Sequence, residues 1–141
     1  EAEKYQAPAH HHHEPESAGS DCLGCHMPGR HYMGVDFRRD HSMRVPRPDL
    51  AVSLGVPDAC TGCHDDRKPA WAAGKVREWF GTARTEARHY GLILHDGDTG
   101  AAGARQQLLA LAQDRSQPGI VRASALERLD RIPDSQAMAM R

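Results

Sequence analysis

Apolar residues recur at near-helical spacing in the second half of the chain and predict four short helices. The predicted helices cover residues 69–81, residues from Thr82 or Thr85 through Leu94 to an end near Gly97, residues 98–114, and residues from Pro118 up to Pro133. The residues expected to face inward are Trp71, Val76, Trp79, Phe80, Leu108, Leu109, Leu111, Ala112, Ile120, Val121, Ala125, Leu126 and Leu129. Alternating short helices of similar size are typical of antiparallel helical repeats. Residues 133–140 resemble the opening of a further helix, so we expect the chain to end inside such an array.

The stretch 22–68 has a different character. Prolines and glycines recur through it, at positions that include 28, 34, 46, 48, 55 and 57. Such a stretch is incompatible with a long helix or a regular sheet. We expect an irregular loop here, with at most single helical turns.

The composition makes an ordinary side-chain core doubtful. Leu, Ile, Val and Phe together make up about 15% of the 141 residues, below the roughly 20% at which globular folding becomes uncertain. The formal net charge is only −1, which argues against intrinsic disorder and against a general nucleic-acid binder. No apolar run approaches the length that a transmembrane helix needs. The chain therefore needs another source of core.

All four cysteines fall in two C-x-x-C pairs, and a histidine follows each pair directly. The two motifs are Cys22-Leu23-Gly24-Cys25-His26 and Cys60-Thr61-Gly62-Cys63-His64. C-x-x-C-H is the attachment signature of c-type haem. The two thiols bind the haem vinyl groups as thioethers, and the adjacent imidazole becomes the proximal ligand of the iron. The sequence predicts two covalent haem c groups, with His26 and His64 as proximal ligands.

Three other interpretations of the cysteines are weaker. A thioredoxin-like redox pair needs a βαβ setting, which no alternating strand pattern supplies. A zinc site with four cysteines usually spaces its pairs by about 15–20 residues, whereas 34 residues separate these pairs. A disulfide within C-x-x-C would close a very small loop and gain little stability.

Haem would also supply the apolar core that the side chains lack, because each macrocycle is a large apolar surface. We therefore predict a mainly α protein with irregular haem-wrapping loops. A dihaem cytochrome c module over residues 1–68 precedes antiparallel helical-repeat-like helices over 69–141. Haem attachment to cysteine takes place outside the bacterial cytoplasm, so we expect a periplasmic protein. The opening residues are polar, and we expect that a signal peptide has been removed or that this is a piece of a longer chain.

Residues 10–81 resemble a family of bacterial multihaem c-type cytochromes that join haem sites to helical repeats. The resemblance is carried by the histidine-rich segment 10–13, Cys25-His26-Met27-Pro28, Tyr32-Met33, Asp36, Arg38-Arg39-Asp40-His41-Ser42, Arg44, Pro46-Arg47-Pro48-Asp49, Pro57, Ala59-Cys60-Thr61-Gly62-Cys63-His64 and Trp71-Ala72. Residues 120–126 look like the start of a HEAT-type or tetratricopeptide-like repeat helix. The resemblance implies electron carriers or binding proteins, and this chain departs from it by stopping after about two helix pairs.

Each iron also needs a sixth ligand or a vacancy. We assign His13 to the first haem and His41 to the second; an exchange of the two is left open, and His10 or His11 is the alternative to His13. His13 lies nine residues before Cys22, enough chain to turn back over the haem, and His41 has Asp40 beside it to fix its ring. Met43 is the rival of His41. A purification-tag remnant is the trivial explanation of the run 10–13.

The remaining histidines and the arginines have simpler expected roles. His31, His89 and His95 are expected at the surface, and Met27 is expected to pack. Arg38 and Arg44, with Arg39 and Arg47, are expected to pair with haem propionates as well as with Asp36, Asp40 and Asp49. The alternative is a solvated charge cluster.

Electron transfer through two bis-histidine haems is the function that the sequence favours, with redox proteins as partners. A haem-based sensor or enzyme would instead keep one sixth position open, with a spare histidine such as His31 above it. A docking protein would act through its helical repeats. Because a repeat shares its core with neighbours, we also expect a possible homodimer through the C-terminal face around Ile132, Met138 and Met140.

Overall fold

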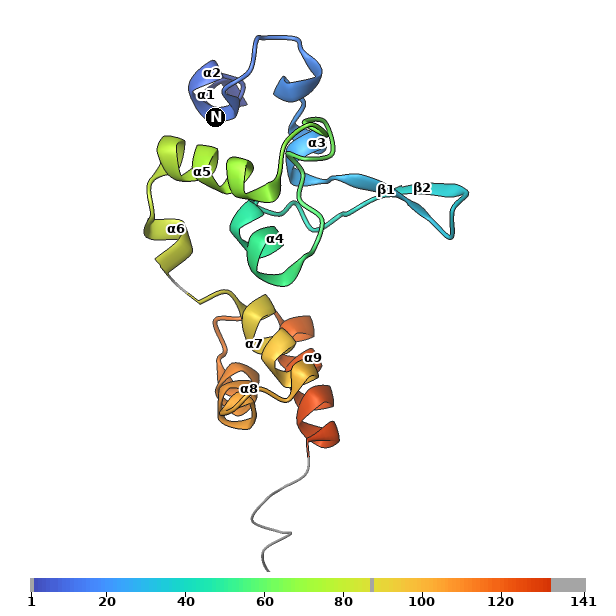
Figure 1. The fold of residues 1–141 in the computed structure, drawn as a ribbon, viewed down its shortest axis with the longest axis vertical. Helices are drawn as coiled ribbons and strands as arrows, with labels where there is room; N and C mark the ends of the chain where they lie inside the picture. The colour runs from blue at the N-terminus through green and yellow to red at the C-terminus, as the bar shows by residue number, and fades with distance from the viewer. Residues whose placement is uncertain (1, 87, 133–141) are drawn as a thin grey trace, which may run out of the picture. The chain divides into compact units, whose positions relative to one another are not determined.

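The computed structural model describes residues 2–86 and 88–132. Within these residues the protein is mainly helical, with one two-stranded sheet (Figure 1). The mainly α class predicted from the sequence is therefore confirmed. The chain divides into two compact units, Glu1–Trp79 and Phe80–Arg141. The predicted boundary lay between residues 68 and 69, so the helix after Pro69 falls almost wholly in the first unit.

The first unit consists of short helices and a hairpin. Its helices are α1 (Ala2–Tyr5), α2 (Pro8–His11), the 3₁₀ turn η1 (Ala18–Ser20), α3 (Cys22–His26), α4 (Pro48–Leu54) and α5 (Pro69–Phe80). Pro48 and Pro69 stand at the start of α4 and α5, where a missing N–H costs nothing. Gly55 ends α4 in the left-handed region, with φ of 67°. The predicted helix over 69–81 is confirmed.

The hairpin is a feature that the sequence did not indicate. Strands β1 (Gly29–Tyr32) and β2 (Asp36–Arg39) pair antiparallel, with His31 opposite Phe37, and Figure 1 shows them projecting from the helices of this unit. Met33 and Gly34 at the tip both have positive φ, 51° and 81°. The expectation of an irregular segment with single helical turns over 22–68 is wrong for this hairpin and for α4.

The first unit has few buried side chains. Among the described residues before Phe80, the buried ones are Pro48, Leu50, Ala51 and Ala72. The buried set holds neither an aromatic ring nor a β-branched side chain. Little apolar surface is therefore removed from water in this unit, as the low content of large apolar residues predicted.

The second unit has a conventional side-chain core. It contains α6 (Ala83–Glu86), α7 (Tyr90–Thr99), α8 (Ala104–Gln113) and α9 (Gly119–Arg131). Helices α7, α8 and α9 pack against one another. The core is formed by Leu108, Leu111, Ala112, Val121 and Ala125, with Tyr90, Ile93, Leu94, Leu129 and Ile132 packed around it.

Two of the predicted helices have other bounds in the structure. The second predicted helix corresponds to two helices, α6 and α7. They are separate because His89 begins a new helix, in which its Nδ1 accepts a hydrogen bond from Gly91 N (3.1 Å). The third begins at Ala104 rather than residue 98, because α7 continues to Thr99 and ends at Gly100 with φ of 68°. The fourth is confirmed as α9.

The inward face of the last two helices is narrower than predicted. Ile120, Leu126 and Leu109 are 76%, 57% and 50% exposed, so their predicted inward placement is wrong. In α9 the buried Val121 and Ala125 lie four residues apart on one stripe, and Ile120 and Leu126 lie outside it. Ile132 packs on the core but is only half-buried, while Met138 and Met140 lie outside the described residues, so the incompletely covered face expected around these three residues stays a prediction.

Replacing Leu108 by Ala should destabilise the second unit by about 2–5 kcal/mol. Leu108 is fully buried at the centre of its core, and its Cδ1 lies 2.7 Å from where a Cβ on Gly97 would stand. The neighbouring Leu109→Ala is the matched control, because this side chain is half exposed. Urea unfolding of both variants, monitored by hydrogen exchange of peptides from residues 90–131, measures the two changes in stability. Equal urea midpoints for the two variants would contradict this packing.

In the part of the chain that the structure describes, no helix is long and apolar enough to span a membrane.

Candidate functional site

Both C-x-x-C-H motifs form tight helical turns that an aspartate caps. In the first motif, Asp21 accepts hydrogen bonds from the backbone N–H groups of Leu23 (3.2 Å) and Gly24 (3.1 Å) at the start of α3. In the second, Asp58 accepts from Cys60 N (2.8 Å), and His64 N donates to Cys60 O (2.9 Å). Each turn holds its two thiols three residues apart with the histidine next in sequence. The capping role of the two aspartates is one that sequence reasoning missed.

The four cysteines are free thiols. Burial, followed by the charge of Asp58, raises the pKa of the Cys60 thiol to about 11, and burial likewise raises the pKa of Cys25. A redox-active dithiol needs a lowered pKa, so these thiols have the opposite electrostatic setting. Repulsion from Cys63 also contributes to the raised pKa of Cys25, which places the two motifs close enough to interact.

His26 is held by the backbone in one orientation. Its Nδ1 donates to the carbonyl oxygen of Arg44 (2.7 Å), and Arg44 N donates back to His26 O (2.9 Å). A carbonyl only accepts, so the proton of a neutral ring is on Nδ1 and Nε2 carries the free lone pair. Imidazoles that ligate metals are commonly fixed by such a bond on their other nitrogen.

Each histidine of the two motifs faces a second histidine from the run 10–13. The ring centroids of His10 and His26 lie 6.0 Å apart with planes 8° from parallel, and those of His13 and His64 also lie 6.0 Å apart, at 33°. His13 was predicted beside His26, with an exchange of distal partners left open. The structure brings it to His64 and places His10 beside His26.

The other two histidines of the run are engaged elsewhere. His11 accepts a hydrogen bond from His13 N on Nδ1 (3.2 Å), and its Nε2 donates to Gln6 O (3.2 Å). Both ring nitrogens are thus in use. The His12 ring stacks on Trp79, with centroids 4.1 Å apart and planes at 6°.

Helix α5 forms a wall beside this site. Trp71 packs against His64 with centroids 4.9 Å apart, and Trp79 eight residues later holds His12. Arg67 lies over the Trp71 ring at 5.7 Å. The sequence placed the two tryptophans on a helix but did not connect them to the histidines, because that contact joins segments far apart in the chain.

His41 lies in an exposed turn, and its neighbouring carboxylate has other partners. Asp40 accepts from Ser42 N (2.9 Å) and pairs with Arg44 Nε (2.8 Å). Hydrogen bonds from Ser42 are the main reason that the pKa of Asp40 is lowered. The carboxylate that was expected to fix the His41 ring therefore binds Ser42 and Arg44 instead. The assignment of His41 as a distal ligand from the sequence stays untested, and the imidazoles that face His26 and His64 are those of His10 and His13.

Three of the four arginines pair with aspartates as predicted, whereas Arg39 donates to Met27 O (3.3 Å) and lies over the Phe37 ring. Arg38 pairs with Asp36 at 2.6 Å and lies over the Tyr32 ring, and Arg44 pairs with Asp40. The half-buried Arg47 makes two hydrogen bonds to Asp49, at 2.8 and 2.7 Å. Pairing with haem propionates stays a prediction. Of the histidines expected at the surface, His31 and His95 are exposed, whereas His89 is half-buried at the start of α7.

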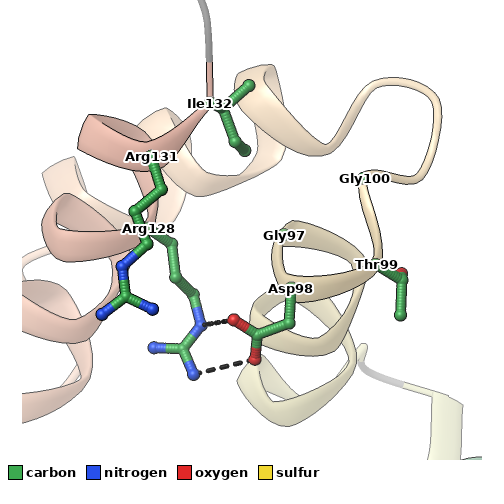
Figure 2. A pocket seen from close by; sticks show the side chains of 7 residues that line it. All are labelled: Gly97, Asp98, Thr99, Gly100, Arg128, Arg131 and Ile132. Atoms are coloured by element: carbon green, nitrogen blue, oxygen red, sulfur yellow. Dashed lines mark hydrogen bonds and ion pairs between the residues drawn. The ribbon is translucent and has the colours of Figure 1, made fainter.

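In the second unit, an open pocket lies where the end of α7 meets the end of α9 (Figure 2). The residues that line it are Gly97, Asp98, Thr99, Gly100, Arg128, Arg131 and Ile132. Asp98 receives Arg128 through two contacts of 2.9 Å each, and Arg131 pairs with Glu127. Both guanidinium groups already have a carboxylate, so the pocket presents no unmatched cation to an anionic ligand.

No protein-family model matches this chain, and no curated protein and no solved structure is significantly similar to it. What the chain binds must be inferred from its own residues. Of these, the paired histidines and the capped cysteine turns are the most informative.

Proposed function

We propose that this chain is a dihaem c-type cytochrome module that carries electrons. Cys22 and Cys25 would hold one haem, and Cys60 and Cys63 the other, with His26 and His64 as proximal ligands. The main support for this proposal is that each of these histidines faces a second imidazole, with the two ring centroids 6.0 Å apart. A bound haem supplies a one-electron iron couple, and the chain supplies the ligands, the attachment points and the apolar cover.

The described residues fit such a group. His26 keeps Nε2 available because Nδ1 is bound to a carbonyl. Leu23 within the first motif and Val56 shortly before the second are 41% and 44% exposed, and an apolar macrocycle gives such side chains a surface to pack on. The scarcity of buried side chains in the first unit points the same way. So does the resemblance of residues 10–81 to multihaem cytochromes.

Electron transfer is favoured over sensing or catalysis because both irons would have imidazole on each side. A filled coordination shell leaves no position for a substrate or a gas. The proximity of the two motifs, seen in the effect of Cys63 on the pKa of Cys25 and of Cys25 on the pKa of Cys60, suits direct electron exchange between two haems. The partners would be other redox proteins, and the compartment the bacterial periplasm, where thiols and haem are joined.

Reduction followed by carbon monoxide titration tests this function. The full chain, produced in a host that matures c-type cytochromes, should be low-spin in both oxidation states and take up two electrons per chain. The reduced protein should not bind carbon monoxide. Binding by one haem or both would mean an open or labile sixth position and would favour a sensor or an enzyme instead.

A further inference from the structure

We propose that the two distal ligands come from one short segment, His10 opposite His26 and His13 opposite His64. This rests on the proposed dihaem function and identifies the ligands that complete its two sites. The assignment from the sequence was His13 for one haem and His41 for the other. In the structure, His10 lies beside His26 and His13 beside His64.

The spacing of the ring pairs carries the proposal. A metal-bound imidazole nitrogen lies about 2 Å from the metal. Since that nitrogen is about 1 Å from its ring centre, two imidazoles on opposite sides of one iron have centres about 6 Å apart. Both pairs have this separation, 6.0 Å. Parallel rings stacked face to face come closer, as His12 and Trp79 do at 4.1 Å.

The available ring nitrogens support the same assignment. The Nδ1 of His13 donates to His11 O, so Nε2 of a neutral ring is left for a metal. This repeats the arrangement of His26 with Arg44 O. His11 has both nitrogens in hydrogen bonds within the segment, which excludes it as the alternative ligand in this conformation.

The backbone explains how neighbouring histidines reach two different sites. Pro8 opens α2, and His12 ends it in the left-handed region with φ of 56°, so the chain leaves the helix between His10 and His13. The His12 ring is held on Trp79 of α5. Gly19 leaves room for the His13 ring, since a Cβ there would stand 2.1 Å from His13 Cδ2.

Single substitutions in the full, haem-loaded chain test the ligands. His10→Ala and His13→Ala should each turn half of the haem high-spin and able to bind carbon monoxide, and the double variant should turn all of it. His41→Ala is the matched control and should change neither property. The unaltered haem in each single variant reports on folding, because it should stay low-spin and inert to carbon monoxide.

Chains with one haem test the pairing. With Cys22 and Cys25 replaced by Ala, His13→Ala should open the remaining site and His10→Ala should leave it closed. With Cys60 and Cys63 replaced, the effects should be reversed. The opposite result in either chain would overturn the pairing.

A glycine substitution tests His13 without removing it. Gly19→Ala should displace the His13 ring and make the same half of the haem reactive to carbon monoxide. Gly74→Ala is the control, since nothing lies within 4 Å of a Cβ at that position. A Gly19→Ala protein as inert to carbon monoxide as the control would contradict the placement of His13.

The outcomes separate this inference from the proposed function. Absence of covalent haem from the unmodified chain would remove the function itself. If two haems are attached but His10→Ala and His13→Ala stay low-spin, the ligand assignment alone is wrong. The same holds if His41→Ala opens a site.

Discussion

Without haem attached, the chain should keep its second unit folded and lose most ordered structure in the first. The second unit buries Leu108, Leu111 and Val121 in one cluster. The largest buried side chains of the first unit are Pro48 and Leu50. Ordering a residue costs about 1–2 kcal/mol of conformational entropy, and so small a buried apolar surface does not offset that cost over this unit. In the haem-loaded protein, the two macrocycles would supply the additional buried apolar surface that stabilises this unit.

Hydrogen exchange measures this difference directly. In protein made without cytochrome maturation, amides over 22–79 should exchange nearly as fast as in an unfolded chain, while those of α7, α8 and α9 stay protected. Haem-loaded protein is the control and should protect both regions. Equal protection of 22–79 with and without haem would show that the first unit has a sufficient core of its own.

Replacing Cys60 and Cys63 together by Ala should leave one covalent haem per chain instead of two. The thioether bonds are the covalent link, so without them the second haem is held only by coordination and is lost on denaturation. The first motif has its own capping aspartate, Asp21, and its own anchor at Arg44 O, so its haem should remain.

Haem content per polypeptide, measured after denaturation, gives the result as a twofold change. Leu23→Val is the matched control, because this residue lies between the cysteines of the first motif and is 41% exposed. It should retain both haems. If the variant without Cys60 and Cys63 carried two covalent haems per chain, or none, the account of two independent attachment sites would be contradicted.

The parts of the fold that depend on local periodicity could be predicted from the sequence. Pro69 and Gly81 bracket α5, and Pro118 precedes α9, so composition and spacing sufficed for both helices. The hairpin could not be predicted, because nearly every residue of β1 and β2 is exposed and no alternation of apolar and polar residues marks them. The end of α7 was missed because Gly97 lies inside that helix, close to Leu108, and Gly100 ends it.

The candidate site was predictable as far as its chemistry is written in neighbouring residues. The cysteines and His26 and His64 follow from the motifs alone. The partner of each histidine does not, since His13 and His64 meet across about fifty residues of chain. Adjacency in sequence also misled: Asp40 stands next to His41, yet its carboxylate binds Ser42 and Arg44. Which side chains come into contact depends on the path of the backbone, and that path is known only from the folded structure.

Intact mass spectrometry of the full chain, produced in a host that matures c-type cytochromes, tests the central claim most directly. We expect a single species heavier than the polypeptide by two haem groups, unchanged after extraction with acidified acetone. A colourless protein with the mass of the bare polypeptide would contradict the dihaem account.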